Sequence, residues 1–305
     1  MRWALSVPGT GDLIVRLTPI LGIVLASFLV VGVALPVLPL HVHDGLGLDA
    51  FVVGIVAGSQ FAASLISRIW SGGHADKRGP RHAVTAGLVA AAASGGVYLA
   101  SLALLPWPAL SVAVLIAGRA VLGAAESFII TGALSWALSL AGPAHAGKTM
   151  AWVGTAMYAA FAGGAPLGTL LYERYGFAAI GTATVLLPLA ALALVALPAA
   201  VPTEPGQRSA LGPTIRAIWA PGVGLAFSSI GFGAITAFAA LLFVTRGWSP
   251  VWLPMTGFAC AFMLPRIFLG HLPDRLGGAR VALLSAIVRP PGSQSSGPRR
   301  APASP

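Results

Sequence analysis

The sequence predicts an all-α membrane protein, and two observations carry this prediction. Hydrophobic residues make up 57% of the 305 residues and charged residues only 9%, whereas an ordinary soluble domain has about 25% charged residues. Long charge-free apolar runs alternate with short polar connections. Each run is long enough for a helix that crosses a bilayer. About eight transmembrane helices are therefore expected.

The spans are bounded by proline, glycine and charge. Pro106-Trp107-Pro108 divides a charge-free run that is too long for one span, and Trp107 suits a membrane interface. Pro36 and Pro39 fall near the end of the first run, where neighbouring helices must satisfy the carbonyls that prolines free. The expected spans are residues 17–40, 50–70, 83–105, 109–134, 149–172, 175–198, 217–245 and 247–271.

One polar segment between apolar runs occurs twice. The letters RIWSGGHADKRG at residues 68–79 are matched in register by RIFLGHLPDRLG at residues 266–277, with Arg, Ile, Gly, Asp and Gly in common. Each copy ends one apolar run and precedes another, as in the internal repeats of many transporters. The chain is therefore expected to contain two related units. They are a complete six-helix half over 1–198, a linker over 199–216, a partial second half over 217–288 and a disordered tail over 289–305.

The formal net charge of +10 reflects membrane orientation and does not indicate a nucleic-acid partner, because Lys and Arg lie between apolar runs and not along one face. Only Arg174 and Arg246 lie in the connections after spans one, three, five and seven. The opposite side holds Arg2, Arg16, Lys77, Arg78, Arg81, Lys148, Arg208, Arg216, Arg275 and Arg280. This bias predicts a cytoplasmic N-terminus in a bacterial inner membrane.

The first copy of the repeat, Gly-x-x-x-Asp-Lys/Arg-x-Gly with basic residues after it, resembles the signature between the second and third helices of the major facilitator superfamily. The second copy resembles its counterpart after the eighth helix, although any loop between spans is basic to some degree. Gly72 is expected to permit close helix approach, and Asp76 to face a helix N-terminus or a basic partner. His74 and Pro80 depart from the family pattern. The resemblance implies a gating motif made of Gly72, Asp76, Lys77, Arg78, Gly79, Arg81, Gly270, Asp274, Arg275 and Gly277.

Two ionisable residues, Arg119 and Glu126, fall inside the expected fourth span. They are two helical turns apart and share a face, and an ionisable residue in a span is a functional candidate. The letters GRAVLG around Arg119 resemble the family's fourth-helix motif, which is associated with proton coupling. Glu126 is therefore expected to take up a proton, and Arg119 to set its pKa or contact the solute, with a structural ion pair as the alternative. Gln60 in the second span is expected to bond either the solute or a neighbouring helix.

A glycine-proline cluster in the fifth span resembles the motif of antiporter members. Gly163, Gly164, Pro166 and Gly168 are expected to form a packing seam between the two halves. The cluster of His41, His43 and Asp44 is a weak metal candidate, and we expect no metal and no cofactor there. Neither a nucleotide-binding loop nor a metalloprotease motif occurs, which argues against an enzyme.

The motifs together resemble the YhhS-like, arabinose-efflux-type group of major facilitators over about residues 15–288. This resemblance implies a monomeric twelve-helix secondary transporter in the lipid bilayer, which moves a small solute against protons by rocking two halves. The ninth apolar run stops at Arg289-Pro290-Pro291. The second half is therefore expected to be incomplete and transport impaired. A natural short form, a shifted reading frame near Arg289 and a fragment that does not transport are the alternatives.

Overall fold

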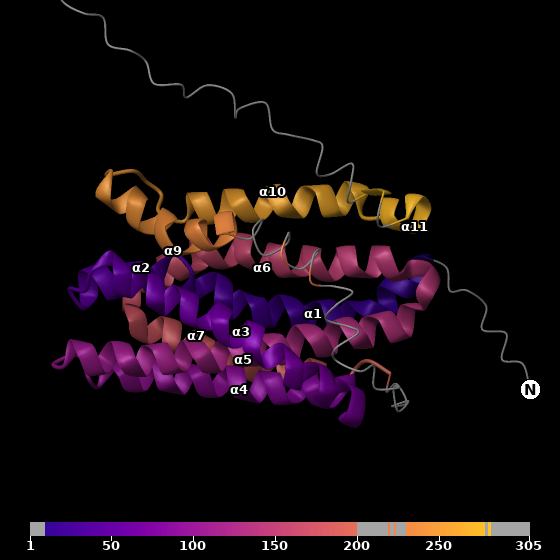
Figure 1. Ribbon diagram of the computed structural model, residues 1–305, viewed down its shortest axis with the longest axis horizontal. Coiled ribbons are helices and arrows are strands. Elements are labelled where there is room, and N and C mark those ends of the chain that lie inside the picture. The colour runs from indigo at the N-terminus through magenta and orange to yellow at the C-terminus, as the bar shows by residue number, and fades with distance from the viewer. Residues whose placement is uncertain (1–9, 200–218, 220–222, 224–229, 278–279, 282–305) are drawn as a thin grey trace, which may run out of the picture.

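The computed structural model describes residues 10–199, 219, 223, 230–277 and 280–281. Every regular element in these ranges is a helix, and the long helices run side by side in one bundle (Figure 1). The predicted all-α membrane fold is therefore confirmed. The expected linker, ninth span and tail lie outside the described residues, apart from Ala199 and Val281.

The helices of the first half follow the predicted order. They are α1 Thr10–Ala34, α2 Val37–Leu40, the π-helix η1 His41–Gly45, α3 Ala50–Arg78, α4 Pro80–Leu102, α5 Pro108–Ala141, the 3₁₀ turn η2 Pro143–His145, α6 Ala146–Tyr175 and α7 Phe177–Leu194. The second half contributes α9 Ile230–Thr245, α10 Leu253–Leu269 and α11 Leu272–Leu276.

Five segments of the described part are long and apolar enough to cross a membrane. They are Leu13–Gly45, Ala50–Arg78, Pro80–Leu102, Pro108–Ala141 and Phe177–Leu194. Helix α6 has 30 residues and is not among these five, and α9 and α10 are shorter apolar helices. The first half therefore accounts for all five of these spans.

Proline and glycine residues mark the ends of several helices. Helix α1 stops two residues before Pro36, which cannot donate a backbone hydrogen bond and clashes with the preceding turn. Gly79, Gly142 and Gly176 follow α3, α5 and α6 with φ of 89°, 75° and 68°. A positive φ is cheap only for glycine, so these residues terminate the helices and reverse the chain.

The first copy of the repeat is almost entirely helical and is not the open turn that its polarity suggests. Helix α3 continues through Arg78, and only Gly79 separates it from α4. Lys77 and Arg78 lie in the last turn of α3, where positive charge stabilises the negative end of the helix. In the second copy, Gly277 has the matching φ of 84°. The two copies therefore share a backbone conformation at their last glycine as well as a sequence pattern.

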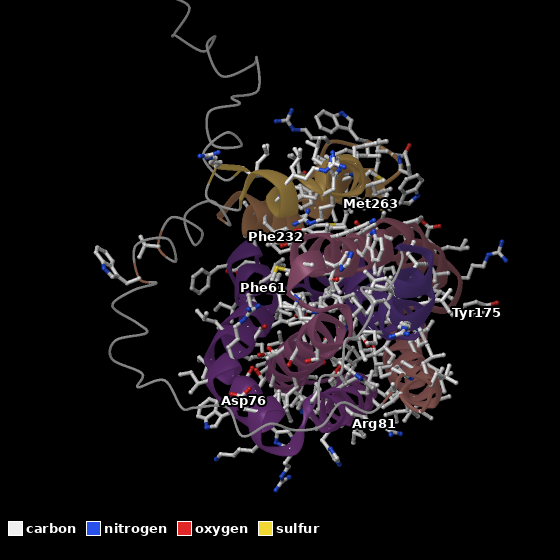
Figure 2. The ribbon with its side chains drawn as sticks, turned by 90° about the vertical axis from the view of Figure 1, so that its right-hand side faces the viewer. Phe61, Asp76, Arg81, Tyr175, Phe232 and Met263 are labelled. Atoms are coloured by element: carbon white, nitrogen blue, oxygen red, sulfur yellow. The ribbon has the colours of Figure 1, made fainter. Side chains whose placement is uncertain are left out.

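The second half rests on one side of the first. Helix α10 packs along α6, and α9 contacts α2 and α3. The Phe61 ring of α3 meets the Phe232 ring of α9 edge to face, with centroids 5.6 Å apart. Figure 2 shows Asp76 and Arg81 on the side of the bundle away from Phe232 and Met263. The two halves therefore meet mainly through α6 and α10.

Candidate functional site

Gln60 of α3 and Glu126 of α5 meet between the two helices. The Gln60 side chain is fully buried, and its Nε2 donates a hydrogen bond of 2.8 Å to Oε2 of Glu126. A side chain at Gly123 would overlap the backbone carbonyl of Gln60. The absence of a side chain at Gly123 therefore lets α3 and α5 approach closely and brings the amide to the carboxyl group.

Arg119 of α5 points to α4 and is 1% exposed. Its Nη1 lies 3.4 Å from the hydroxyl oxygen of Tyr98, to which it donates, and Tyr98 is itself fully buried. A Cβ at Gly118 would lie 2.8 Å from Cδ1 of the Tyr98 ring. Gly118 therefore leaves the space in which the tyrosine lies against α5 and reaches the arginine.

Arg119 and Glu126 make no ion pair with each other, although both are described. Each takes its hydrogen-bond partner from a different helix, Tyr98 of α4 and Gln60 of α3. Two buried polar atoms of this group, Oε1 of Gln60 and Nε of Arg119, have no hydrogen-bond partner in the part of the chain that the structure describes. The arrangement therefore retains one free acceptor and one free donor.

Sequence reasoning missed Tyr98 and a second polar contact between α3 and α5. The Ser71 hydroxyl lies 3.0 Å from that of Ser127 and 3.3 Å from that of Thr131. Single hydroxyl groups are frequent in apolar runs, so none of these residues stands out in the sequence. A tyrosine within a run free of charge was the only available signal for Tyr98.

The two copies of the gating motif differ in how closely another helix packs against their first glycine. No described atom lies within 4 Å of a Cβ built at Gly72, so the expected close helix approach does not occur among the described helices. No described helix covers that face of α3. Gly270 at the matching position does lie against Ala151 of α6, because α10 packs there.

The charged residues of the motif lie at the surface. Asp76, Lys77, Arg78, Arg81 and Arg275 are exposed. Asp76 makes no ion pair with any described residue, so of its two expected partners, a helix N-terminus or a basic residue, the described part of the chain does not supply the second. The side chain of Asp274 lies outside the described part of the chain.

The glycine cluster of the fifth span packs inside the first half. Cβ atoms at Gly164 and Gly168 would overlap the backbone of α1 at Gly32 and Val33, whereas the space beside Gly163 is open. Pro166 lies within α6. The sequence predicted that this cluster forms a seam between the two halves, whereas Gly164 and Gly168 pack within the first half.

The α6–α10 contact uses another face of α6. Oγ1 of Thr256 on α10 donates a hydrogen bond of 2.9 Å to the Ala162 carbonyl of α6. Gly154 of α6 is covered by Arg266 of α10, whose Nε would lie 2.8 Å from a Cβ built there. Sequence reasoning therefore singled out Gly270 at this contact but missed Gly154.

The histidine cluster forms a π-helical turn. The His41 ring stacks on Phe177 of α7, with centroids 3.9 Å apart and planes 3° apart. Nδ1 of His43 lies 2.9 Å from the Leu48 carbonyl oxygen. Within the described ranges, no group of three His, Cys, Asp or Glu side chains is placed to hold a metal ion.

Long apolar helices around a buried amide, a buried guanidinium and a half-buried carboxyl group define a multi-pass helical membrane protein. The chain belongs to the Major Facilitator Superfamily, whose family model matches residues 20–288. This confirms the superfamily that the motifs indicated. The superfamily is one of membrane transporters.

The chain is similar to bacterial proteins of this superfamily. An uncharacterized MFS-type transporter of Salmonella typhimurium is 43% identical over 263 residues, which cover 86% of this chain and 68% of that relative. Uncharacterized MFS-type transporters of Burkholderia mallei and Burkholderia pseudomallei are 37% identical over 258 residues, which cover 85% of this chain and 63% of each relative. The chain thus spans about two thirds of the length of these relatives.

Proposed function

We propose that this chain takes part in secondary active transport of a small solute across the bacterial inner membrane, as a proton-coupled efflux system of the YhhS-like group. Gln60, Arg119 and Glu126 form the site at which solute and proton act on each other. The protein works as a monomer by alternating access, with its N-terminus in the cytoplasm. Membership of a transporter superfamily supports the class of function.

The observation that carries this proposal is the buried polar group shared by α3, α4 and α5. A buried polar atom without a partner costs free energy, and ionisable residues in spans mark solute or proton pathways. Among the described residues, Oε1 of Gln60 and Nε of Arg119 have no hydrogen-bond partner, and Gln60 is the one residue that donates to Glu126. A solute with one donor and one acceptor would satisfy both open atoms.

The hydrogen bond between Gln60 and Glu126 suggests how a proton and a solute would compete. An ionised Glu126 accepts from Nε2 of Gln60 in a charge-assisted bond, which is stronger than a neutral one. Protonation of Glu126 removes the charge and weakens that bond. Gln60 can then turn its amide toward another partner, so proton uptake would change what the site offers to the solute.

We expect transport by this chain to be reduced, because Arg289-Pro290-Pro291 interrupts its ninth apolar run. The alternative of a fragment that does not transport receives no support from the comparisons, which match transporters over most of the chain. If transport is only reduced, a solute still drives proton movement across the membrane. If the chain does not transport, it drives none.

The test uses proteoliposomes that contain the 305-residue chain and a trapped pH dye, with a panel of sugars, drugs and metabolites outside. A solute of the transported class is expected to produce proton movement. Glu126→Gln should reduce this movement by about a hundredfold, because the amide cannot carry a proton. Glu173→Gln, the same change at an exposed position of α6, is the matched control and should leave it unchanged.

Undiminished proton movement in the Glu126→Gln protein would refute a proton-carrying role for Glu126. Equal loss in Glu126→Gln and Glu173→Gln would also contradict the proposal, because the effect would then not depend on the buried site.

A further inference from the structure

Helices α6 and α10 run antiparallel and meet in residue pairs that are spaced about one turn apart along α6. The pairs are Ala151 with Gly270, Gly154 with Arg266, Tyr158 with Phe262, and Ala162 with Thr256. Small residues, stacked rings or a neutral hydrogen bond form the other pairs, but an arginine keeps its positive charge. A charge therefore lies in the contact between the two halves.

The Arg266 side chain is held against α6 by a tyrosine ring and by the space beside a glycine. Its guanidinium carbon lies 4.6 Å from the centre of the Tyr158 ring, and Tyr158 is 8% exposed. Nε of Arg266 would lie 2.8 Å from a Cβ built at Gly154, so the missing side chain admits the arginine. Nη1 of Arg266 donates a 2.7 Å hydrogen bond to the Phe262 carbonyl of α10. Tyr158 belongs to the first half and Arg266 to the second, so a cation–π contact joins the halves.

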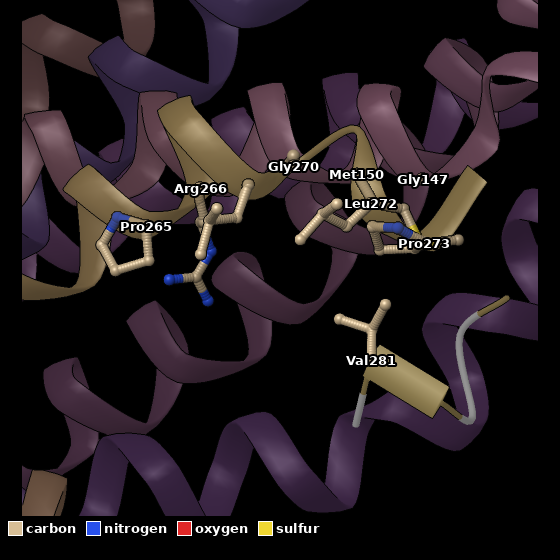
Figure 3. A pocket seen from close by; sticks show the side chains of 10 residues that line it. Gly147, Met150, Pro265, Arg266, Gly270, Leu272, Pro273 and Val281 are labelled. Atoms are coloured by element: carbon tan, nitrogen blue, oxygen red, sulfur yellow. The ribbon is translucent and has the colours of Figure 1, made fainter. Parts of the chain in front are cut away.

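Arg266 also borders a cavity of about 570 Å³ beside α6 and α10. Figure 3 shows its side chain reaching into this space, with Val281 across from Leu272 and Pro273. The guanidinium can therefore leave the Tyr158 ring by rotation of its side chain, without a shift of either helix backbone. The contact between guanidinium and ring is thus one that the protein can make and break.

The first copy of the repeat has an arginine at the matching position. Arg68 of α3 corresponds to Arg266 of α10, and each lies one turn before the first glycine of its motif, Gly72 or Gly270. Arg68 is exposed, on the side of α3 that no described helix covers. Arg266 is half-buried, because α6 packs on its side of α10. In the described part of the chain, the arginine of the repeat is therefore covered only where a helix of the other half packs against it.

We propose that Arg266 and Tyr158 form a reversible latch between the two halves. When the halves are together, the guanidinium lies on the Tyr158 ring beside Gly154. When they separate, it leaves the ring and turns into the neighbouring cavity. This inference rests on the proposed alternating access, since a latch matters only if the halves separate. A cation–π contact is strong enough to shift such an equilibrium and weak enough to break in each transport cycle.

The test measures the distance between the halves in the 305-residue chain by double electron–electron resonance, without any solute. One spin label is attached at Ala144→Cys, before α6, and the other at Phe268→Cys of α10, after Cys260→Ser. Both labelled positions are exposed, and neither lines the cavity. Arg266→Gln should raise the ratio of separated to closed molecules about fivefold, which corresponds to about 1 kcal/mol. Tyr158→Leu should raise it by a similar factor, because it removes the same contact.

Two further variants serve as controls. Tyr158→Phe keeps an aromatic face under the guanidinium and should change the ratio by less than about twofold. Arg246→Gln removes the cation from a contact of the same kind, since the Arg246 guanidinium lies 5.9 Å from the centre of the Trp248 ring. Both of these residues follow α9 in the second half, so this variant should leave the ratio unchanged.

The double variant Tyr158→Leu/Arg266→Gln distinguishes a latch from two unrelated effects. It should match either single variant, because the same contact is lost in all three. Additive increases would overturn the pairing of Arg266 with Tyr158. An unchanged ratio in both single variants, with folding verified by circular dichroism, would overturn the latch. Failure of the proposed function is a separate result, because it appears as a wild-type chain without solute-driven proton movement, whatever the distances are.

Discussion

At the scale of single residues, each buried polar side chain of the candidate site depends on a partner from another helix. Tyr98 supplies the hydroxyl oxygen that accepts from Arg119, and both side chains are almost completely buried. A charged group away from water is stable only when hydrogen bonds replace its hydration. Tyr98 is therefore a positioning residue for the Arg119 guanidinium.

Tyr98→Phe removes this acceptor while it keeps the ring that packs against Gly118. We expect the free energy of unfolding to fall by about 1 kcal/mol, the usual size of such a bond within a membrane bundle. Titration with a denaturing detergent, followed by circular dichroism, measures this change. Tyr175→Phe, at a side chain that is 68% exposed, is the control and should have no effect. Equal midpoints for the two variants would show that the Arg119 contact contributes nothing to stability.

At the scale of helices, glycine determines which pairs pack backbone to backbone. Gly123 brings α5 to α3, and Gly164 and Gly168 bring α6 to α1. Close packing by small residues replaces the hydrophobic effect as a source of helix association within a bilayer. The same α6 thus contacts α1 through one face and α10 through another.

Gly168→Ala tests the α6–α1 contact, because the new methyl group would overlap the Val33 carbonyl. We expect a loss of about 1–3 kcal/mol in unfolding free energy, as for other overpacked sites. Gly163→Ala lies on the same helix with open space beside it and should be neutral or stabilising by up to about 1 kcal/mol, since alanine favours the helix. Equal stability of the two variants in the detergent titration described above would contradict this packing.

At the scale of the whole molecule, two copies of one motif end with the same backbone geometry. Gly79 has φ 89° and Gly277 has φ 84°, and each follows a helix that carries basic residues near its end. When an even number of spans separates corresponding residues of two related units, both residues lie on the same side of the membrane. Lys77 and Arg275 should therefore share the cytoplasmic side.

Cysteine labelling tests this orientation, after the single Cys260 has been replaced by serine. An impermeant maleimide should label Lys77→Cys and Arg275→Cys only in inside-out vesicles. Arg246→Cys, in the connection after α9, should be labelled only in right-side-out vesicles. Labelling of Lys77→Cys and Arg275→Cys on opposite sides would show that the two halves do not share one topology.

The sequence alone determined the fold class, the order of the helices and the repeat. These features depend on local properties, such as the length of an apolar run, the missing donor of Pro36 and the positive φ that Gly79 and Gly176 allow. The extent of α3 was the exception, because a polar segment can be helical when its end is capped by charge and glycine.

Only the tertiary structure decided which side chains meet. Gln60 with Glu126, Tyr98 with Arg119, and Gly154 with Arg266 all join segments far apart in the chain. Such pairs depend on how each helix is rotated about its axis, which the shapes of its neighbours set. Gly72 and Gly270 show the consequence, since matching positions in the two copies of the motif have open space in one half and a packed helix in the other.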